Sequence, residues 1–316
     1  MLHTILGAGG SIGNALAKGL LKNNQKVRLV SRRGYSLNGA ESIKGDLLSY
    51  ADVLASVKDS DVIYLCAGLK YDSLVWSNEW PIIMENIIGV CKGTTKKLIF
   101  FDNVYMYGKV EGKMTESTPY NPCSKKGEVR AKIARRLIDE MKTENIRAII
   151  ARAGDLYGPY CFYNSIPYVM ILSRMLKGKK ANWLLNLDIP HSWTYTIDCA
   201  NALYLLAQDD SAIGEVWHLP TCNPPLTGKM FIEIVAKELN VNPNYVELKK
   251  FMIKIAGLFD KTIKELWEML YQYEYPYYFD STKFEKHFNY KPVDYEQGIK
   301  DTIKFLKQNA TIIKKL

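Results

Sequence analysis

The chain has 316 residues, of which 47% are apolar and 24% are charged, and its formal net charge is +9. These proportions are ordinary for a globular protein that buries a sizeable core, and they exclude a disordered or fibrous chain. The positive charge is spread over scattered lysines without a basic block, so we predict no nucleic-acid partner.

The six cysteines stand far apart, at positions 66, 91, 123, 161, 199 and 222, and the four histidines are scattered. Because neither a Cys-x-x-Cys pair nor a His-Glu-x-x-His motif is present, we predict no metal site and no disulfide framework. The first apolar strand begins at Leu2, and no apolar run approaches the length of a membrane span. We therefore expect a reduced, cytoplasmic protein with no membrane partner.

The first thirty-odd residues have the pattern of a dinucleotide-binding βαβ unit. An apolar strand runs into a glycine-rich turn, an amphipathic helix follows, and a second apolar strand covers 27–30. Glycines allow backbone N–H groups to approach a pyrophosphate, where a Cβ would stand in the way. The residues predicted to hold the cofactor at this turn are Gly7, Gly9, Gly10, Ser11, Ile12 and Gly13.

The second strand leads into Ser31, Arg32 and Arg33, at the place where such a unit meets the adenosine ribose. A carboxylate there would bind a free 2′-hydroxyl, whereas guanidinium groups pair with a 2′-phosphate. This pattern favours NADP. Two solvated arginines at a strand end are the alternative interpretation, so NAD stays open.

Apolar strands and helices then alternate as far as residue 152. Strands are predicted over 43–47, 61–68, 97–102 and 147–152, and helices over 50–57, 80–92 and 125–142. Such alternation predicts an α/β fold with a doubly wound parallel sheet of the Rossmann type. Ligands of these sheets bind beyond the carboxyl ends of the strands.

Several further cofactor candidates follow the predicted strands. They are Asp46, Leu47, Cys66, Ala67, Gly68, Ala153 and Gly154. Asp46 could face the adenine edge or cap the 50–57 helix, and both interpretations stay open. Asn86 lies inside the 80–92 helix, where asparagine is a poor residue, which indicates a local role.

The second half of the chain has a different sequence pattern, in which short predicted strands lie between helices. Helices are predicted over 167–176, 198–207, 228–239 and 251–271, and strands over 182–185, 192–195 and 215–219. We expect two interleaved domains. The Rossmann domain would comprise 1–155 with 191–222, and a smaller α/β substrate-binding domain would comprise 156–190 with 223–316.

Taken in order, the loops resemble those of the extended short-chain dehydrogenase/reductases, the NAD-dependent epimerase/dehydratase family, over essentially the whole chain. The matching stretches are Gly7-x-x-Gly10-x-x-Gly13, Asn86 three residues before Gly89, Tyr107-Gly108, Arg152-x-x-Asp155-x-Tyr157-Gly158-Pro159 and Tyr195-Thr-Ile-Asp198-Cys-Ala200. The resemblance implies a small-molecule substrate, nucleotide-sugar-like in this family, and a fold that often forms homodimers. It offers Asn86, Asp155, Tyr157 and His191 as substrate-binding residues.

The chemistry of that family rests on Ser or Thr, Tyr and Lys, with the Tyr and the Lys four residues apart. Here Asn103 stands in the Ser/Thr place, and an asparagine and a proline stand four residues before Lys125 and Lys126. Tyr120 misses the spacing by one or two residues, which would rotate its side chain away. We therefore predict that the usual proton-transfer tyrosine is missing.

Three explanations of this departure stay open. Asn103 and Lys126 could polarise and protonate a substrate by themselves, or Tyr105 on the same loop could take over the acid–base role. Alternatively, the chain is a catalytically silent NAD(P)H-binding sensor or scaffold. The leading prediction is an NAD(P)-dependent oxidoreductase or epimerase/dehydratase-like enzyme acting on a small hydroxyl- or carbonyl-bearing, or sugar-derived, substrate.

Two departures concern the substrate. His191 stands where the family typically places an arginine for a nucleotide diphosphate, and Asp155 replaces an asparagine. Histidine is mostly neutral near pH 7 and has no bidentate fork, and a carboxylate opposes a diphosphate. The sequence therefore leaves nucleotide binding by the substrate site open, and His191 could equally be a turn residue after Pro190.

Overall fold

The structure is a computed structural model that describes residues 1–162 and 165–309. The chain forms two compact units. The first comprises residues 1–108, 116–153 and 199–219, and the second comprises residues 109–115 and 154–198 and the chain from 220 onwards.

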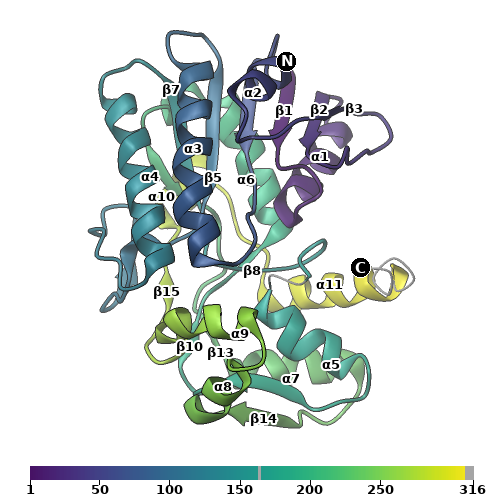
Figure 1. Cartoon of the computed structure of the whole chain (residues 1–316). Helices are drawn as coiled ribbons and strands as arrows, with labels where there is room; N and C mark the ends of the chain where they lie inside the picture. The colour runs from purple at the N-terminus through teal and green to yellow at the C-terminus, as the bar shows by residue number, and fades with distance from the viewer. Residues whose placement is uncertain (163–164, 310–316) are drawn as a thin grey trace. The chain divides into compact units, whose positions relative to one another are not determined.

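The first unit is built on a parallel sheet of seven strands in the order β12-β7-β5-β4-β1-β2-β3, with helices packed on it (Figure 1). The strands are β1 (Leu2–Leu6), β2 (Lys26–Ser31), β3 (Glu41–Lys44), β4 (Val62–Leu65), β5 (Lys97–Asp102), β7 (Arg147–Arg152) and β12 (Val216–His218). The predicted Rossmann-type fold is confirmed. Strand order reverses between β1 and β4, which is the switch point where ligands of such sheets bind.

The helices of this unit follow the predicted order. They are α1 (Ser11–Lys22), α2 (Tyr50–Ser56), α3 (Ser73–Cys91), α4 (Lys125–Lys142) and α6 (Thr196–Gln208), with short 3₁₀ turns η1 (Tyr105–Tyr107) and η3 (Asp210–Ala212). The helix predicted over 80–92 begins earlier, because Asp72 caps it by accepting from the Leu74 N–H. The added turns bury Trp76 in the core of this unit.

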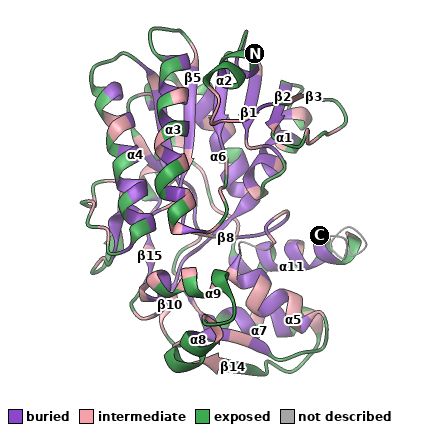
Figure 2. Cartoon of the chain, in the orientation of Figure 1, coloured by how far each residue is buried: buried purple, intermediate pink, exposed green. Residues whose placement is uncertain are grey.

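The core of the first unit lies between the sheet and the helices α3 and α4, which pack against each other. Apolar strands covered by helices have no water-facing side, so they read as continuous apolar runs in the sequence. The central strands β4, β5 and β7 are accordingly buried in Figure 2, while α3 and α4 expose their outer faces. This core holds the carboxyl ends of the strands in fixed register.

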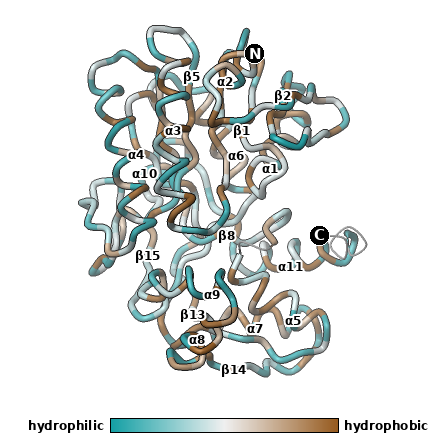
Figure 3. Tube along the Cα trace, viewed as in Figure 1, coloured by the Kyte–Doolittle hydropathy of each residue, from teal (hydrophilic) through white to brown (hydrophobic). Residues whose placement is uncertain are grey.

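The second unit is built of short strand pairs and helices. Its strands are β6 (Lys113–Met114), β8 (Asp155–Tyr157), β9 (Ala181–Leu184), β10 (Pro190–His191), β11 (Trp193–Tyr195), β13 (Leu226–Thr227), β14 (Tyr245–Leu248) and β15 (Tyr278–Phe279). Its helices are η2 (Pro167–Leu172), α5 (Ser173–Met175), α7 (Gly228–Leu239), α8 (Lys250–Ala256), α9 (Lys261–Leu266), η4 (Trp267–Tyr273), α10 (Thr282–Phe288) and α11 (Tyr295–Gln308). Figure 3 shows hydrophobic residues concentrated in α8.

One sequence prediction is wrong in this unit. The single helix predicted over 251–271 is three shorter ones, because Asp260 caps a new helix by accepting from the N–H groups of Thr262 and Ile263. The compact second unit also includes residues 109–115, 154–155, 191–198 and 220–222, which the expected boundaries gave to the Rossmann domain, and the domain boundaries stay a prediction. In this unit β10 pairs with β13, β11 pairs with β8, and β6 pairs with β15.

Candidate functional site

The glycine-rich turn lies between β1 and α1, beside the end of β4. Gly7 has a φ of +93°, and a Cβ added there would lie 2.4 Å from the Cα of Ala67. A Cβ at Gly13 would lie 3.0 Å from the carbonyl oxygen of Gly7. Backbone therefore passes against backbone at this point, which only a residue without a side chain allows at position 7.

The N-terminus of α1 is open. Its N-cap is Gly10, which has no side chain to accept from the helix, and the first helical turn carries no acidic residue. The N–H groups of Ser11, Ile12 and Gly13 precede the first bond of the helix, in which Asn14 donates to the carbonyl of Gly10. Such a terminus combines spare donors with the positive end of the helix dipole, which suits a phosphate.

The loop after β2 folds over this turn. The Tyr35 hydroxyl donates to Asn14 Oδ1, and the Tyr35 N–H donates to Ser31 Oγ at 2.7 Å. A Cβ at Gly9 would lie 3.2 Å from the Tyr35 ring. Arg32 and Arg33 on this loop are exposed to solvent. The sequence analysis missed Tyr35, because no motif distinguishes it from other loop aromatics.

Asp46, predicted at the cofactor, and Asn86, predicted at the substrate, both hold the next loop in place. Asp46 accepts from the Leu48 N–H at 3.1 Å, whereas the cap of α2 is Ser49, so the capping interpretation of Asp46 is wrong. A role of Asp46 at the adenine edge stays a prediction. Asn86 on α3 donates from Nδ2 to the Leu47 carbonyl at 2.9 Å, so its side chain ties the helix to this loop.

The remaining cofactor candidates follow β4 and β7. Cys66 is buried, and burial raises the pKa of its thiol to about 12, so it stays protonated. Gly68, two residues on, is exposed. The N–H of Ala153 donates to the Asp102 carbonyl in the first unit, and the N–H of Gly154 donates to Thr194 Oγ1 in the second.

The three catalytic candidates lie on adjacent elements at the carboxyl end of β5. Asn103 Oδ1 accepts from the Tyr105 N–H at 3.1 Å and so shapes η1. Gly127 lets α4 begin directly against this turn, because a Cβ there would lie 2.6 Å from the Tyr105 carbonyl oxygen. The structure thus brings the loop of Asn103 and Tyr105 against the helix that carries Lys126.

Lys126 is fully buried, and its ammonium lies 4.4 Å from the centroid of the Tyr71 ring. Tyr71 comes from the loop between β4 and α3. The Tyr105 ring instead stacks on Trp76, at a centroid distance of 6.1 Å. Tyr71 was missed from the sequence, since it lies 55 positions from Lys126 and belongs to no motif.

A buried polar network lies at the ends of β5, β7 and β12. Asp102 accepts from Arg130 Nε at 2.7 Å, and Arg152 Nε lies 3.5 Å from its other oxygen. Arg152 also donates to the hydroxyl of Tyr107 at 2.7 Å and to that of Tyr120. The Tyr107 hydroxyl lies 2.8 Å from His218 Nε2.

Charges in this network are fixed by burial and by one another. Burial alone would lower the pKa of Arg152, but Tyr107 and Asp102 together raise it above its ordinary value. Burial also raises the pKa values of Tyr107 and Tyr120. Arg152 therefore stays charged while both phenols stay neutral, and the Tyr120 hydroxyl points to Arg152.

In the second unit, Asp155 and His191 form a pair. His191 Nε2 lies 3.0 Å from Asp155 Oδ2, which also accepts from the Tyr273 hydroxyl at 3.0 Å. The imidazole is buried and stacks on Tyr277 and Trp193, at centroid distances of 4.3 and 4.8 Å. His191 lies in β10 and in this aromatic stack, so the turn-residue interpretation is wrong, and its role toward a substrate stays a prediction.

Tyr157 lies in the core of the second unit. It is buried against Tyr195, Phe231 and Tyr295, and Gly298 leaves the space that its hydroxyl fills. The structure thus gives this residue a packing role, where the resemblance offered it as a substrate contact.

Within 1–162 and 165–309, no group of three or more His, Cys, Asp and Glu side chains is arranged to hold a metal ion. Over the same residues, no helix is both long and apolar enough to cross a bilayer.

Residues 3–219 match the family model described as NAD dependent epimerase/dehydratase family. This match covers more than half of the chain. The chain belongs to the NAD-dependent epimerase/dehydratase family. This confirms the family resemblance that the sequence motifs indicated. A comparison with curated proteins found no match.

Several solved structures share the fold. A dTDP-glucose 4,6-dehydratase from Bacillus anthracis, in complex with NAD, is 20% identical with a TM-score of 0.81, and 98% of each chain is covered. A UDP-glucuronic acid 4-epimerase from Bacillus cereus, in complex with UDP-glucuronic acid and NAD, is 19% identical with a TM-score of 0.80, covering 98% of this chain and 99% of that one. A UDP-glucose 4-epimerase from Thermus thermophilus, in complex with NAD, is 16% identical with a TM-score of 0.78, covering 97% and 99%.

The buried ionic network around Asp102 leads to a prediction about the stability of the protein. Arg130→Met would leave the buried Asp102 carboxylate without its closest cation, which is expected to cost roughly 3–5 kcal/mol of unfolding free energy. Urea denaturation followed by circular dichroism measures this loss.

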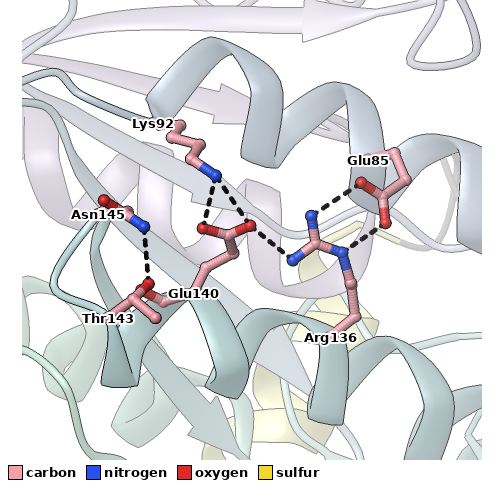
Figure 4. A network of polar contacts seen from close by, with 6 residues as sticks. All are labelled: Glu85, Lys92, Arg136, Glu140, Thr143 and Asn145. Atoms are coloured by element: carbon pink, nitrogen blue, oxygen red, sulfur yellow. Dashed lines mark hydrogen bonds and ion pairs between the residues drawn. The ribbon is translucent and has the colours of Figure 1, made fainter.

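Arg136→Met is the matched control on the same helix (Figure 4). Arg136 bridges Glu85 and Glu140 on the surface of α3 and α4, at 2.7 and 2.8 Å, and Lys92 completes the group. Because these groups are more exposed, the control should lose much less stability. Equal losses in the two variants would contradict the assignment of Arg130 as the main partner of a buried charge.

Proposed function

We propose that this chain is a nicotinamide-dependent oxidoreductase or epimerase/dehydratase-like enzyme. The observation that carries the proposal is the open N-terminus of α1 behind a turn in which a Cβ at Gly7 would overlap backbone. Family membership and three structural neighbours that are complexes with NAD support a nicotinamide cofactor. When bound, that cofactor accepts or supplies a hydride.

The residues of the first unit fit such a cofactor. The N–H groups of Ser11, Ile12 and Gly13 would bind the pyrophosphate. Arg32 and Arg33 are exposed after β2 and would pair with a 2′-phosphate, so NADP is the proposed preference over NAD. The Asp46 loop, tied to α3 through Asn86, would lie at the adenine.

Proton transfer is proposed to use Lys126 and Tyr71. Lys126 keeps its position because it is buried against the Tyr71 ring. The Lys126 ammonium lies over the Tyr71 ring, which sets a phenol, a side chain that can act as a general acid–base, against a fixed cation. The hydroxyl of Tyr71 would exchange a proton with the substrate oxygen. The Asn103 amide would donate a hydrogen bond to the same oxygen. Tyr105 is the less favoured phenol, because its ring stacks on Trp76.

The proposed substrate is a small compound with a hydroxyl or carbonyl group, sugar-derived or simpler. Asp155 presents a carboxylate that His191 and Tyr273 both contact, so this part of the second unit does not offer a free cation to a diphosphate. A nucleotide sugar, as bound by the Bacillus cereus neighbour, is therefore less favoured than a substrate without phosphate.

Cofactor preference is tested by calorimetric titration with NAD⁺ and NADP⁺. Replacing Arg32 and Arg33 together by alanine should weaken NADP⁺ binding about 10- to 100-fold, because hydrogen bonds to a charged phosphate are lost. Binding of NAD⁺ should stay unchanged.

Lys22→Ala with Lys26→Ala removes the same charge at exposed positions of α1 and β2 and should change neither affinity. If both double variants weakened NADP⁺ binding equally, the loss of affinity would come from the change in net charge alone. A wild-type preference for NAD⁺ would overturn the proposed cofactor.

The acid–base role is tested by steady-state oxidation of NADPH with a panel of aldehydes and ketones. Tyr71→Phe keeps the ring against Lys126 and removes only the hydroxyl, so kcat should fall about a hundred- to ten-thousandfold with cofactor binding intact. Tyr105→Phe is the matched control and should keep most of the activity.

If Tyr105→Phe lowered kcat more than Tyr71→Phe, Tyr105 would be the acid–base residue. Tight cofactor binding without turnover of any substrate in the wild-type protein would favour the silent sensor or scaffold.

A further inference from the structure

The segment from Lys249 to Trp267 exposes an unusual run of large apolar side chains. Phe251, Ile255 and Leu258 follow one another at i, i+4 and i+7, so they share one face of α8 and its continuation. Their exposed fractions are 65%, 54% and 77%, and that of Phe259 is 87%. Figure 2 shows α8 as exposed and Figure 3 shows it as hydrophobic.

The opposite face of the same segment is anchored. Ile253 is buried in the core of the second unit, and Ile263 and Leu266 of α9 pack against that core. The helices α8 and α9 also contact each other. The exposed apolar residues therefore stand on a supported tip, and their exposure does not come from an unfolded end of the chain.

Lysines are interleaved with these apolar residues along the segment. The five exposed lysines of the segment are Lys249, Lys250, Lys254, Lys261 and Lys264. The segment itself has two carboxylates, Asp260 and Glu265, and the Asp260 carboxylate caps α9. Lys249 pairs with Glu247 and Lys250 pairs with Glu274, so five lysines face four carboxylates and the tip keeps one excess positive charge.

We propose that this tip docks on the surface of an anionic lipid bilayer. Phe251, Leu258 and Phe259 would enter the boundary between headgroups and acyl chains, and the lysines would lie among the anionic headgroups. Apolar residues interleaved with lysines match both layers of such a surface. A protein partner would instead need an apolar groove bordered by acidic residues.

The proposal goes beyond the cofactor chemistry and does not depend on it. The sequence analysis predicted no membrane partner because it searched for an apolar run that could span a bilayer. The short α8 lies within a stretch that it assigned to one long helix, so the exposed face could not be recognised from the sequence.

The test is cosedimentation of the full chain with large vesicles. One set contains phosphatidylcholine alone, and the other adds about 30 mol% phosphatidylserine to give an anionic surface. We expect binding to the anionic vesicles that weakens as salt is raised, and little binding to the neutral ones.

Two variants should remove this binding. Leu258→Ser with Phe259→Ser is expected to weaken it at least tenfold, through loss of the inserted side chains. Lys254→Glu with Lys264→Glu should weaken it at least as much, since each lysine near an anionic surface contributes roughly a fivefold gain in affinity. Circular dichroism confirms that each variant is folded.

Matched controls carry the same changes elsewhere. Leu74→Ser removes a leucine that is 69% exposed on α3, and Lys300→Glu with Lys304→Glu reverses two exposed lysines of α11. Both should bind vesicles like the wild-type protein. The proposal is overturned by equal binding to neutral vesicles, by equal loss in the controls, or by absence of vesicle binding. A wild-type dimer that the Leu258→Ser, Phe259→Ser variant dissociates, without vesicle binding, would assign the tip to a second copy of the chain.

Discussion

The close approach of two backbone segments at Gly7 is the constraint on which the first unit depends. The turn after β1 passes against Ala67 at the end of β4, and a single Cβ would fill the gap. This contact lets α1 begin at the switch point of the sheet with its first N–H groups free of any side-chain cap. The proposed anion site would therefore follow from the path of the chain, and it would need no charged side chain of its own.

The second determinant is the ionic network around Asp102. Burying a carboxylate is costly unless cations and hydrogen bonds surround it, and here Arg130 and Arg152 do so from α4 and β7. Since Asp102 directly precedes Asn103, the same contacts fix the start of the loop that carries the catalytic candidates. Arg152 extends the network to Tyr107 and Tyr120, which holds that loop from its other side. Charge pairing thus fixes the start of the loop that carries Asn103 and Tyr105.

Much of the first unit could be predicted from its sequence. Buried parallel strands give continuous apolar runs, so β5 and β7 were predicted with their observed bounds, as was α4. The helix α3 was predicted too short, because its first turns, which follow the Asp72 cap, were not recognised in the sequence. In the second unit the two-residue strands have no pattern of their own, since pairing with distant partners defines them.

Some residues of the candidate site could likewise be recognised from the sequence, and others could not. The glycine turn was recognisable because its residues are close in sequence and each has a steric reason. Tyr71 beside Lys126 and Tyr35 over Gly9 were not recognisable, because they depend on loops that meet only in the folded unit. Likewise, Tyr157 matched a family motif, but its packing in the core is a property of its neighbours in space.

The central claim, that the start of α1 binds the pyrophosphate of a nicotinamide nucleotide, is tested most directly by amide hydrogen exchange. The account predicts that NADP⁺ slows exchange at the N–H groups of Ser11, Ile12 and Gly13, and that Gly10→Asp abolishes this protection because its carboxylate takes up the same donors. Unchanged exchange at these three amides in the presence of excess NADP⁺ or NAD⁺ would contradict it.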